Sequence, residues 1–154
     1  MSESLQLDPA TLETWLNWAG RKFLALPSRS ALPQGFKSFW PKYDYDEVDL
    51  ETALHVKLRA EQAPKANELD YIEQILSIPA LCVEIKHRRV LQYRTIIDPI
   101  SGKHIYNWSR IAKQLKTSRQ NVRNWYEVAL RDACGKVEEN KVCRLAQFFS
   151  SLDL

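Results

Sequence analysis

The spacing of apolar residues predicts that most of the chain is helical. Five of them, starting at residue 12, recur at i, i+3, i+4, i+7 and i+11, as on one face of a helix. They are Leu12, Trp15, Leu16, Ala19 and Phe23. Asp8 and Pro9 precede them, which is typical of a helix start. The same periodicity predicts helices over residues 48–63, 67–77 and 80–97.

Residues 108–127 predict a helix, a tight turn and a second helix. The apolar members of this stretch are Ile111, Ala112, Leu115, Val122 and Trp125. Lys116 and Thr117 leave room only for a turn. Ser118 suits the N-cap of the second helix, because its hydroxyl can accept a hydrogen bond from an otherwise unpaired backbone N–H. We therefore expect an all-α, multi-helix bundle with a C-terminal helix-turn-helix.

The helix predicted over residues 80–97 leads into this motif and has two contrasting faces. Its apolar residues are Leu81, Val83, Ile85, Val90, Leu91 and Tyr93. Its outer face carries Lys86, His87, Arg88, Arg89 and Arg94. Such cations can form a solvated face, or they can hold backbone phosphates beside the motif. Residues 98–107 then read as a turn-rich connector around Pro99 and Gly102 that could carry a short wing.

The pattern continues beyond the motif. Gly135 is predicted to cap the C-terminal end of its second helix. Apolar residues then recur at steps of three, four and three, at Val142, Leu145, Phe149 and Leu152. This spacing predicts one more helix, which either closes the core of the chain or forms a coiled-coil-like seam with a second copy.

Residues 26–49 predict a long loop, because prolines and Gly35 break the helical pattern. Five aromatic residues in it lead into a group of four acids. The aromatic residues are Phe36, Phe39, Trp40, Tyr43 and Tyr45, and the acids are Asp44, Asp46, Glu47 and Asp49. Either the rings pin the loop to the helical core, or Phe39, Trp40, Tyr43 and Tyr45 form a docking strip for a protein such as a polymerase subunit.

Charge is distributed unevenly along the chain. Residues 86–131 hold eleven Lys and Arg against two acids, a local net charge of +9, although the whole chain carries only +3. Residues 1–85 carry −5 and residues 132–154 carry −1. A basic block between acidic flanks indicates where a polyanion would bind. Double-stranded DNA is therefore the partner we expect.

The side chains exposed around the predicted turn are suited to DNA, because they can pair with phosphates and read base edges in a major groove. The candidates at the turn and on the second helix are Lys116, Thr117, Ser118, Arg119, Gln120, Asn121, Arg123 and Asn124. Lys103, Arg110 and Lys113 are the candidates for holding the phosphate backbone.

Other function classes have less support in the sequence. No Gly-rich phosphate loop is present, and His55, His87 and His104 lie in separate segments without a Cys or carboxylate at ligand spacing. We therefore expect a protein that is not an enzyme, with no catalytic residues, no metal and no cofactor. Three cysteines without CxxC spacing, a polar N-terminus and no long apolar run predict a cytoplasmic location and no membrane partner.

Residues 72–133 resemble region four of bacterial sigma factors. LSIPALCVEIKHRRVLQYR is similar to the helix before the motif in that family, and YNWSRIAKQLKTSRQNVRNWYEVALRDA is similar to its helix-turn-helix. The resemblance implies that the helix starting at Ser118 enters the major groove, with Arg119, Gln120, Arg123 and Asn124 reading bases. Lys116 stands where such motifs usually have glycine. The whole layout is similar to that of an uncharacterised family of phage and prophage proteins.

These patterns divide the chain into three regions and leave three candidate functions. Residues 1–71 are expected to bind a partner or to oligomerise, 72–135 to bind DNA, and 136–154 to close the core or form a dimer seam. The function we favour is a transcriptional regulator of phage or mobile-element type. A phage small terminase subunit and an adaptor that uses the aromatic strip are the alternatives. RNA polymerase or another protein as partner, and a homo-oligomer, stay open.

Overall fold

The computed structural model describes residues 7–25, 63–99 and 101–152, and within these ranges the chain forms six α-helices and no β-strand. The helices are α1 (Pro9–Leu24), α3 (Leu69–Leu76), α4 (Ile85–Thr95), α5 (Trp108–Gln114), α6 (Arg119–Lys136) and α7 (Glu139–Ser151), with a short 3-10 helix, η4 (Ile78–Leu81). The predicted all-α class is confirmed. The aromatic loop and the helix predicted over residues 48–63 lie outside the described residues.

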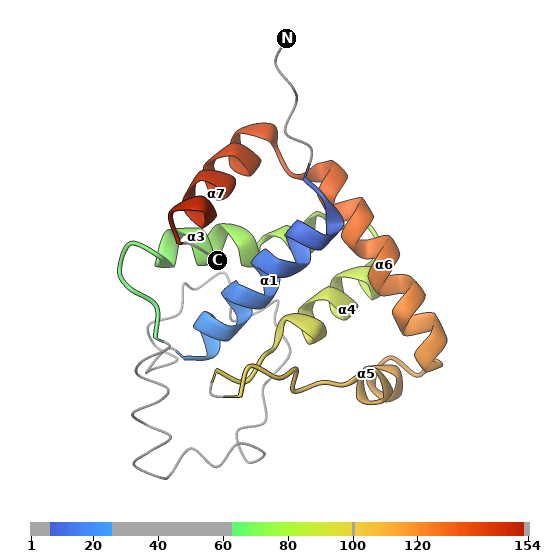
Figure 1. Cartoon of the computed structure of the whole chain (residues 1–154). Helices are drawn as coiled ribbons and strands as arrows, with labels where there is room; N and C mark the ends of the chain where they lie inside the picture. Colours follow the sequence, from blue (N-terminus) through green and yellow to red (C-terminus); the bar gives the residue numbers. More distant parts are fainter. Residues whose placement is uncertain (1–6, 26–62, 100, 153–154) are drawn as a thin grey trace, which may run out of the picture.

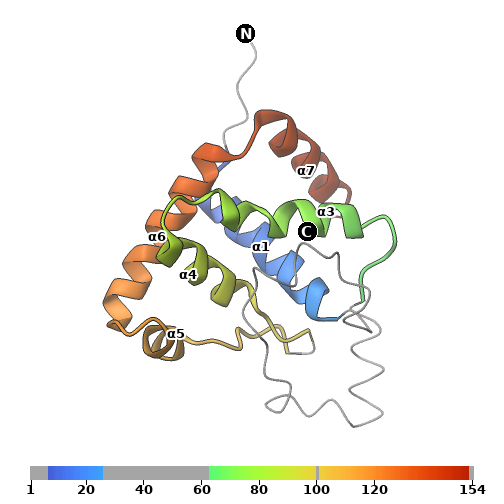
Figure 2. The same cartoon turned by 180° about the vertical axis from the view of Figure 1, so that it is seen from behind.

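Helix α1 lies at the centre of the arrangement, where it packs against α3, α4 and α6 (Figure 1). Helix α6 runs along one edge and packs against α4 and α5. Seen from behind, α3 and α4 lie over α1, and α5 lies at the start of α6 (Figure 2). No helix in these ranges is long and apolar enough to cross a membrane.

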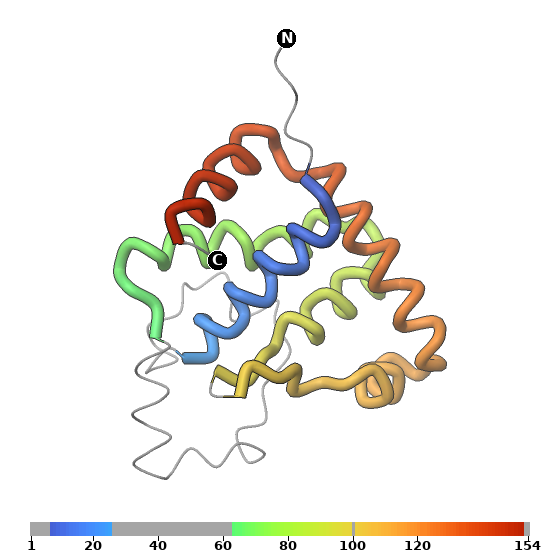
Figure 3. Tube along the Cα trace, viewed as in Figure 1, coloured from blue at the N-terminus to red at the C-terminus, as the bar shows by residue number. Residues whose placement is uncertain are grey.

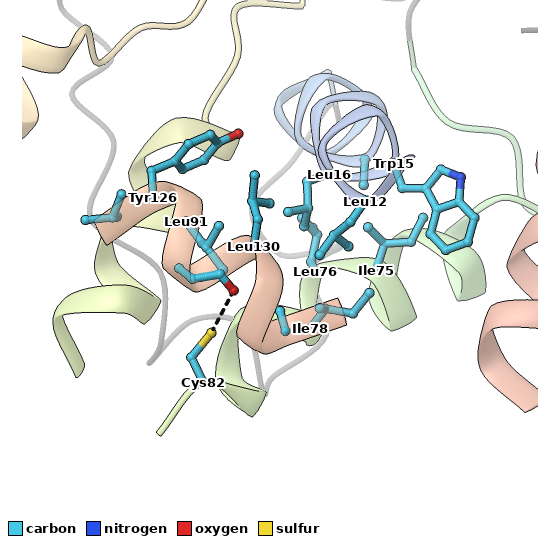
Figure 4. Close-up of a cluster of buried hydrophobic side chains, with 14 of the residues drawn as sticks. Leu12, Trp15, Leu16, Ile75, Leu76, Ile78, Cys82, Leu91, Tyr126 and Leu130 are labelled. Atoms are coloured by element: carbon cyan, nitrogen blue, oxygen red, sulfur yellow. Dashed lines mark hydrogen bonds between the residues drawn. The ribbon is translucent and has the colours of Figure 1, made fainter. Parts of the chain in front are cut away.

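The predicted apolar face of α1 forms the middle of the core. Leu12 and Leu16 are buried and point towards Ile75 and Leu76 of α3 and Ile78 of η4 (Figure 4). Leu91 and Leu130 extend the same cluster towards α4 and α6. Of the five predicted α1 positions, only Phe23 remains partly exposed. The periodicity therefore identified this face correctly.

Helix α7 turns back from the end of α6 towards α3 (Figure 3). Aromatic rings join it to α1 and α3. Phe149 stacks on Trp15, with ring centroids 5.3 Å apart, and Phe148 stacks on Tyr71 at 4.0 Å. Trp18, which lies off the apolar stripe of α1, meets Phe148 edge-to-face at 5.4 Å. Val142, Leu145 and Phe149, which the spacing placed on one face, are buried in the core of this chain.

Helices α1 and α4 approach so closely that only glycine fits at residue 20. A Cβ at that position would lie 1.8 Å from the carbonyl oxygen of Thr95, the last residue of α4. Thr95 is itself buried, and its hydroxyl donates to the carbonyl of Leu91. The contact therefore fixes the end of α4 directly on the backbone of α1.

The prediction of a single helix over residues 80–97 is wrong. Cys82 and Glu84 have extended backbone, with ψ angles of 133° and 127°, so the chain is interrupted between η4 and α4. The thiol of Cys82 is buried against α6, where it donates to the carbonyl of Ala129 at 3.6 Å (Figure 4). Val83 and Ile85, which were predicted on the apolar face, are consequently 73% and 63% exposed. Burial of Cys82 turns its neighbours outward.

The end of α6 also differs from the prediction. Gly135 does not cap the helix, because α6 continues to Lys136 and ends where Val137 becomes extended. The ammonium of Lys136 pairs with the carboxylate of Asp132 one turn earlier, at 3.1 Å. Nothing lies within 4 Å of the place that a Cβ on residue 135 would occupy. This glycine is an ordinary exposed position in the last helical turn.

Candidate nucleic-acid interface

Local hydrogen bonds shape the turn between α5 and α6. Thr117 N–H donates to the carbonyl of Ala112 at 2.9 Å, which closes the turn. The hydroxyl of Ser118 accepts from the backbone N–H of Asn121 at 3.2 Å, so the predicted N-cap is confirmed. Lys116 has a φ of +55°, the left-handed region that favours glycine. The turn therefore holds a lysine at a strained position, as its place in the sequence suggested.

The packing of α5 on α6 corrects two predicted core residues, because Leu115 and Trp125 are only partly buried. Ile111, Ala112 and Val122 are buried as expected. Trp125 is only partly buried, and the Lys86 ammonium lies 4.9 Å above its ring. Tyr126, which follows Val122 by four residues, is the aromatic side chain on the buried face. A four-residue step keeps a side chain closer to the same helix face than a three-residue step does here.

All five polar candidates on the first two turns of α6 are exposed. They are Arg119, Gln120, Asn121, Arg123 and Asn124. Gln120 donates to Asn124 Oδ1 at 3.3 Å, which aligns the two amides along one helix face. Asn121 instead bonds to the hydroxyl of Thr117 at 3.0 Å. Asn121 and Thr117 therefore contribute to the turn itself. We call Arg119, Gln120, Arg123 and Asn124 the α6 face.

Trp108, the first residue of α5, connects this face to the interior and was not among the predicted site residues. Together with Arg119, Gln120 and Arg123 it lines a hollow of about 420 Å³. The Arg123 guanidinium lies 5.6 Å from the centroid of the Trp108 ring. Arg119 reaches the hydroxyl of Ser109 at 3.5 Å. A tryptophan directly after the Asn107 cap was the only sequence signal for this position.

Arg94 lies behind Trp108, and its prediction as an outer-face cation is wrong. Its guanidinium lies 4.1 Å from the centroid of the Trp108 ring and donates to the carbonyl of Tyr106 at 3.1 Å. Burial lowers the pKa of Arg94. His104 Nδ1–H donates to the Arg94 carbonyl at 2.7 Å, since a carbonyl can only accept. Burial, followed by the charge of Arg94, lowers the pKa of His104. Arg94 therefore holds the Trp108 ring in position through this contact.

The structure brings most of the predicted backbone-contact residues together, but not all of them. Arg110 and Lys113 line one hollow beside α5. Lys116 shares another with Lys86 and Arg89 of α4. Lys103 follows Gly102 on a hairpin whose glycine lies against the Arg21 guanidinium at the end of α1. Figures 1 and 2 show this hairpin well apart from α5. Lys103 is therefore not part of the group around α6.

The resulting surface has the properties of an anion-binding face. Its guanidinium and ammonium groups come from α4, α5 and the start of α6, and amide side chains lie between them. Amides can both donate to and accept from a base edge, whereas the cations match phosphate. Comparisons with protein-family models, with curated proteins and with solved structures found no match for the chain.

Proposed function

We propose that the chain binds double-stranded DNA with the α6 face in the major groove. One observation carries the proposal. The four side chains of this face are exposed together at the start of an 18-residue helix, beside the cations of α5 and its turn. An α-helix fits the major groove, where the pattern of donors and acceptors distinguishes all base pairs.

Each residue has a role in this proposal. Arg119 and Arg123 pair with guanine edges or phosphates, and Gln120 and Asn124 pair with adenine edges. Phosphates are held by Arg110, Lys113 and Lys116. Arg94 and Trp108 act as positioning residues, because the indole separates the half-buried Arg94 from the hollow that Arg119 and Arg123 line.

Regulation of transcription is the role that we favour for this DNA binding. The resemblance of residues 72–133 to region four of sigma factors supports it, since that region binds promoter DNA. A phage or mobile-element origin rests on the similarity of the whole layout. A partner protein that binds residues 1–71 would link DNA binding to transcription.

A selection of bound duplexes from a random pool, followed by fluorescence anisotropy, tests the proposal. We expect Arg119→Ala to weaken binding to the selected duplex by about 1–3 kcal/mol and to relax the sequence preference of the protein. Lys113→Ala should weaken all sequences alike and reduce the slope of log K against log salt by about one. Arg144→Ala on α7 removes the same charge away from the α6 face and should leave affinity unchanged. Absence of duplex binding at low salt would refute the proposal.

A further inference from the structure

Four of the five large apolar side chains that are exposed among the described residues lie close to one another. Leu81, Val83 and Ile85 come from η4 and its link to α4, and Val128 comes from α6. Their exposed fractions range from 39% to 73%. The Cys82–Ala129 hydrogen bond joins the two segments, since Val83 follows Cys82 and Val128 precedes Ala129. We call these four residues the apolar strip.

The strip continues into a hollow of about 380 Å³ between the start of α4, the α5–α6 turn and Trp125. Ile85, Leu115 and Trp125 supply its apolar wall. Three cations line the same hollow, and no carboxylate does: these are Lys86, Arg89 and Lys116. Glu84 and Glu127 are the nearest acids along the chain, and neither lines the hollow. A hollow lined by apolar side chains and by cations fits a ligand that is both apolar and acidic.

We infer that this surface binds an acidic amphipathic helix of a partner protein. One apolar side chain of that helix fills the hollow against Ile85 and Trp125, and others cover Val83 and Val128. Carboxylates on its flanks pair with Lys86 and Arg89, which leaves Lys116 to the DNA phosphates. Charge complementarity of this kind sets orientation and suppresses partners of the wrong sign.

Other occupants fit less well. A second copy of this chain would bring the same three cations against one another, which is unfavourable. Duplex DNA would satisfy the cations but would leave Val83 and Ile85 against a highly charged backbone. Trp125 and Val128 lie three residues apart, on the flank of α6 away from Arg119 and Arg123. A partner on this flank and DNA on the α6 face can therefore be bound together.

The test uses the full chain and two synthetic amphipathic peptides of about four helical turns. Both have Leu on the apolar face, and one has Glu and the other Lys on the polar face. We expect the Glu peptide to bind, with quenching or a shift of tryptophan fluorescence, and the Lys peptide not to bind. Ile85→Ser should weaken binding of the Glu peptide by about tenfold or more, because it removes apolar contact area from the hollow without changing charge. Leu69→Ser removes an exposed apolar side chain elsewhere and should have no effect.

Duplex DNA and sedimentation measurements complete the design. Affinity for DNA should be the same for Ile85→Ser and the wild type, and bound DNA should not displace the Glu peptide. The inference is overturned if the Glu peptide fails to bind, if both peptides bind equally, or if Ile85→Ser binds normally. If the wild type is a dimer and Ile85→Ser is a monomer, the surface binds a second copy of the chain and the inference is overturned. If Ile85→Ser loses DNA binding, the surface binds DNA and the inference is likewise overturned. Peptide binding is measured without DNA, so the two proposals can fail separately.

Discussion

The phenolic hydroxyl of Tyr126 donates a hydrogen bond to Oε2 of Glu13 across 2.7 Å. Tyr126 is buried on α6, and Glu13 lies on α1. The ring of Trp108 packs edge-to-face on Tyr126, with centroids 5.2 Å apart. This one side chain therefore connects the first helix of the core with both helices that flank the turn.

Removal of this hydroxyl should destabilise the fold. We expect Tyr126→Phe to lower the free energy of unfolding by about 1–2 kcal/mol, because the hydrogen bond to a charged carboxylate is lost. Urea denaturation followed by circular dichroism measures it. Tyr71→Phe is the matched control, since Tyr71 is held by ring stacking on Phe148. Equal effects of the two substitutions would contradict a role for the Glu13 contact.

Stability should fall as the pH rises above about 9. Burial raises the pKa of the Cys82 and Cys134 thiols to about 11. Burial and the hydrogen bond to Glu13 also raise the pKa of the Tyr126 hydroxyl. The unfolded chain loses these protons at lower pH than the folded chain does. The folded chain therefore binds more protons in this range, and the free energy of unfolding falls as the pH rises. Urea denaturation from about pH 8 to pH 10.5, with a reductant present, measures the fall. A constant free energy of unfolding would show that these groups are not buried.

Two glycines should respond in opposite ways to the same substitution. Gly20→Ala should cost at least about 2 kcal/mol, because its Cβ would meet the Thr95 carbonyl oxygen. Gly135→Ala should raise the free energy of unfolding by about 0.5–1 kcal/mol, because alanine favours a helix and the space is open. Thermal unfolding of both variants gives the comparison. Similar shifts for the two would argue against the close packing of α1 on α4.

Lys116 offers a test that separates backbone strain from charge. Lys116→Gly should be more stable than Lys116→Ala by about 1 kcal/mol, because only glycine adopts a positive φ without a steric cost. Both variants lose the same ammonium, so both should weaken DNA binding to the same small extent. Chemical denaturation and anisotropy on the same samples measure the two effects. If Lys116→Ala equals Lys116→Gly in stability, the turn does not hold a left-handed residue.

Sequence periodicity predicted α1 and the two helices around the turn well. Each of them has a continuous apolar face and a recognisable start at Asp8, Asn107 or Ser118. The Ser118 cap also followed from local chemistry, whereas the unusual conformation of Lys116 was implied by the resemblance to helix-turn-helix motifs. Such features depend on neighbours within a few residues, and the sequence shows those directly.

The errors arose where distant contacts decide the local structure. Burial of Cys82 against Ala129 breaks the helix predicted over residues 80–97, and nothing near Cys82 in the sequence shows this. Arg94 was placed on a solvated face because arginine usually is, whereas in the structure its guanidinium is half-buried and lies over the ring of Trp108. The position of Lys103 likewise depends on where the hairpin meets α1. Tertiary packing therefore had the larger effect at these positions.

The stacking of Phe149 on Trp15 has a consequence for how the chain folds. These rings belong to α1 and α7, which are far apart in the sequence, so the ring cluster forms only after α7 has been synthesised. Until then the aromatic side chains of α1 have no partner on α7 and stay open to other apolar surfaces. Contacts of such long sequence separation slow folding. A nascent chain stalled before α7 should therefore depend on chaperones more than the finished protein does.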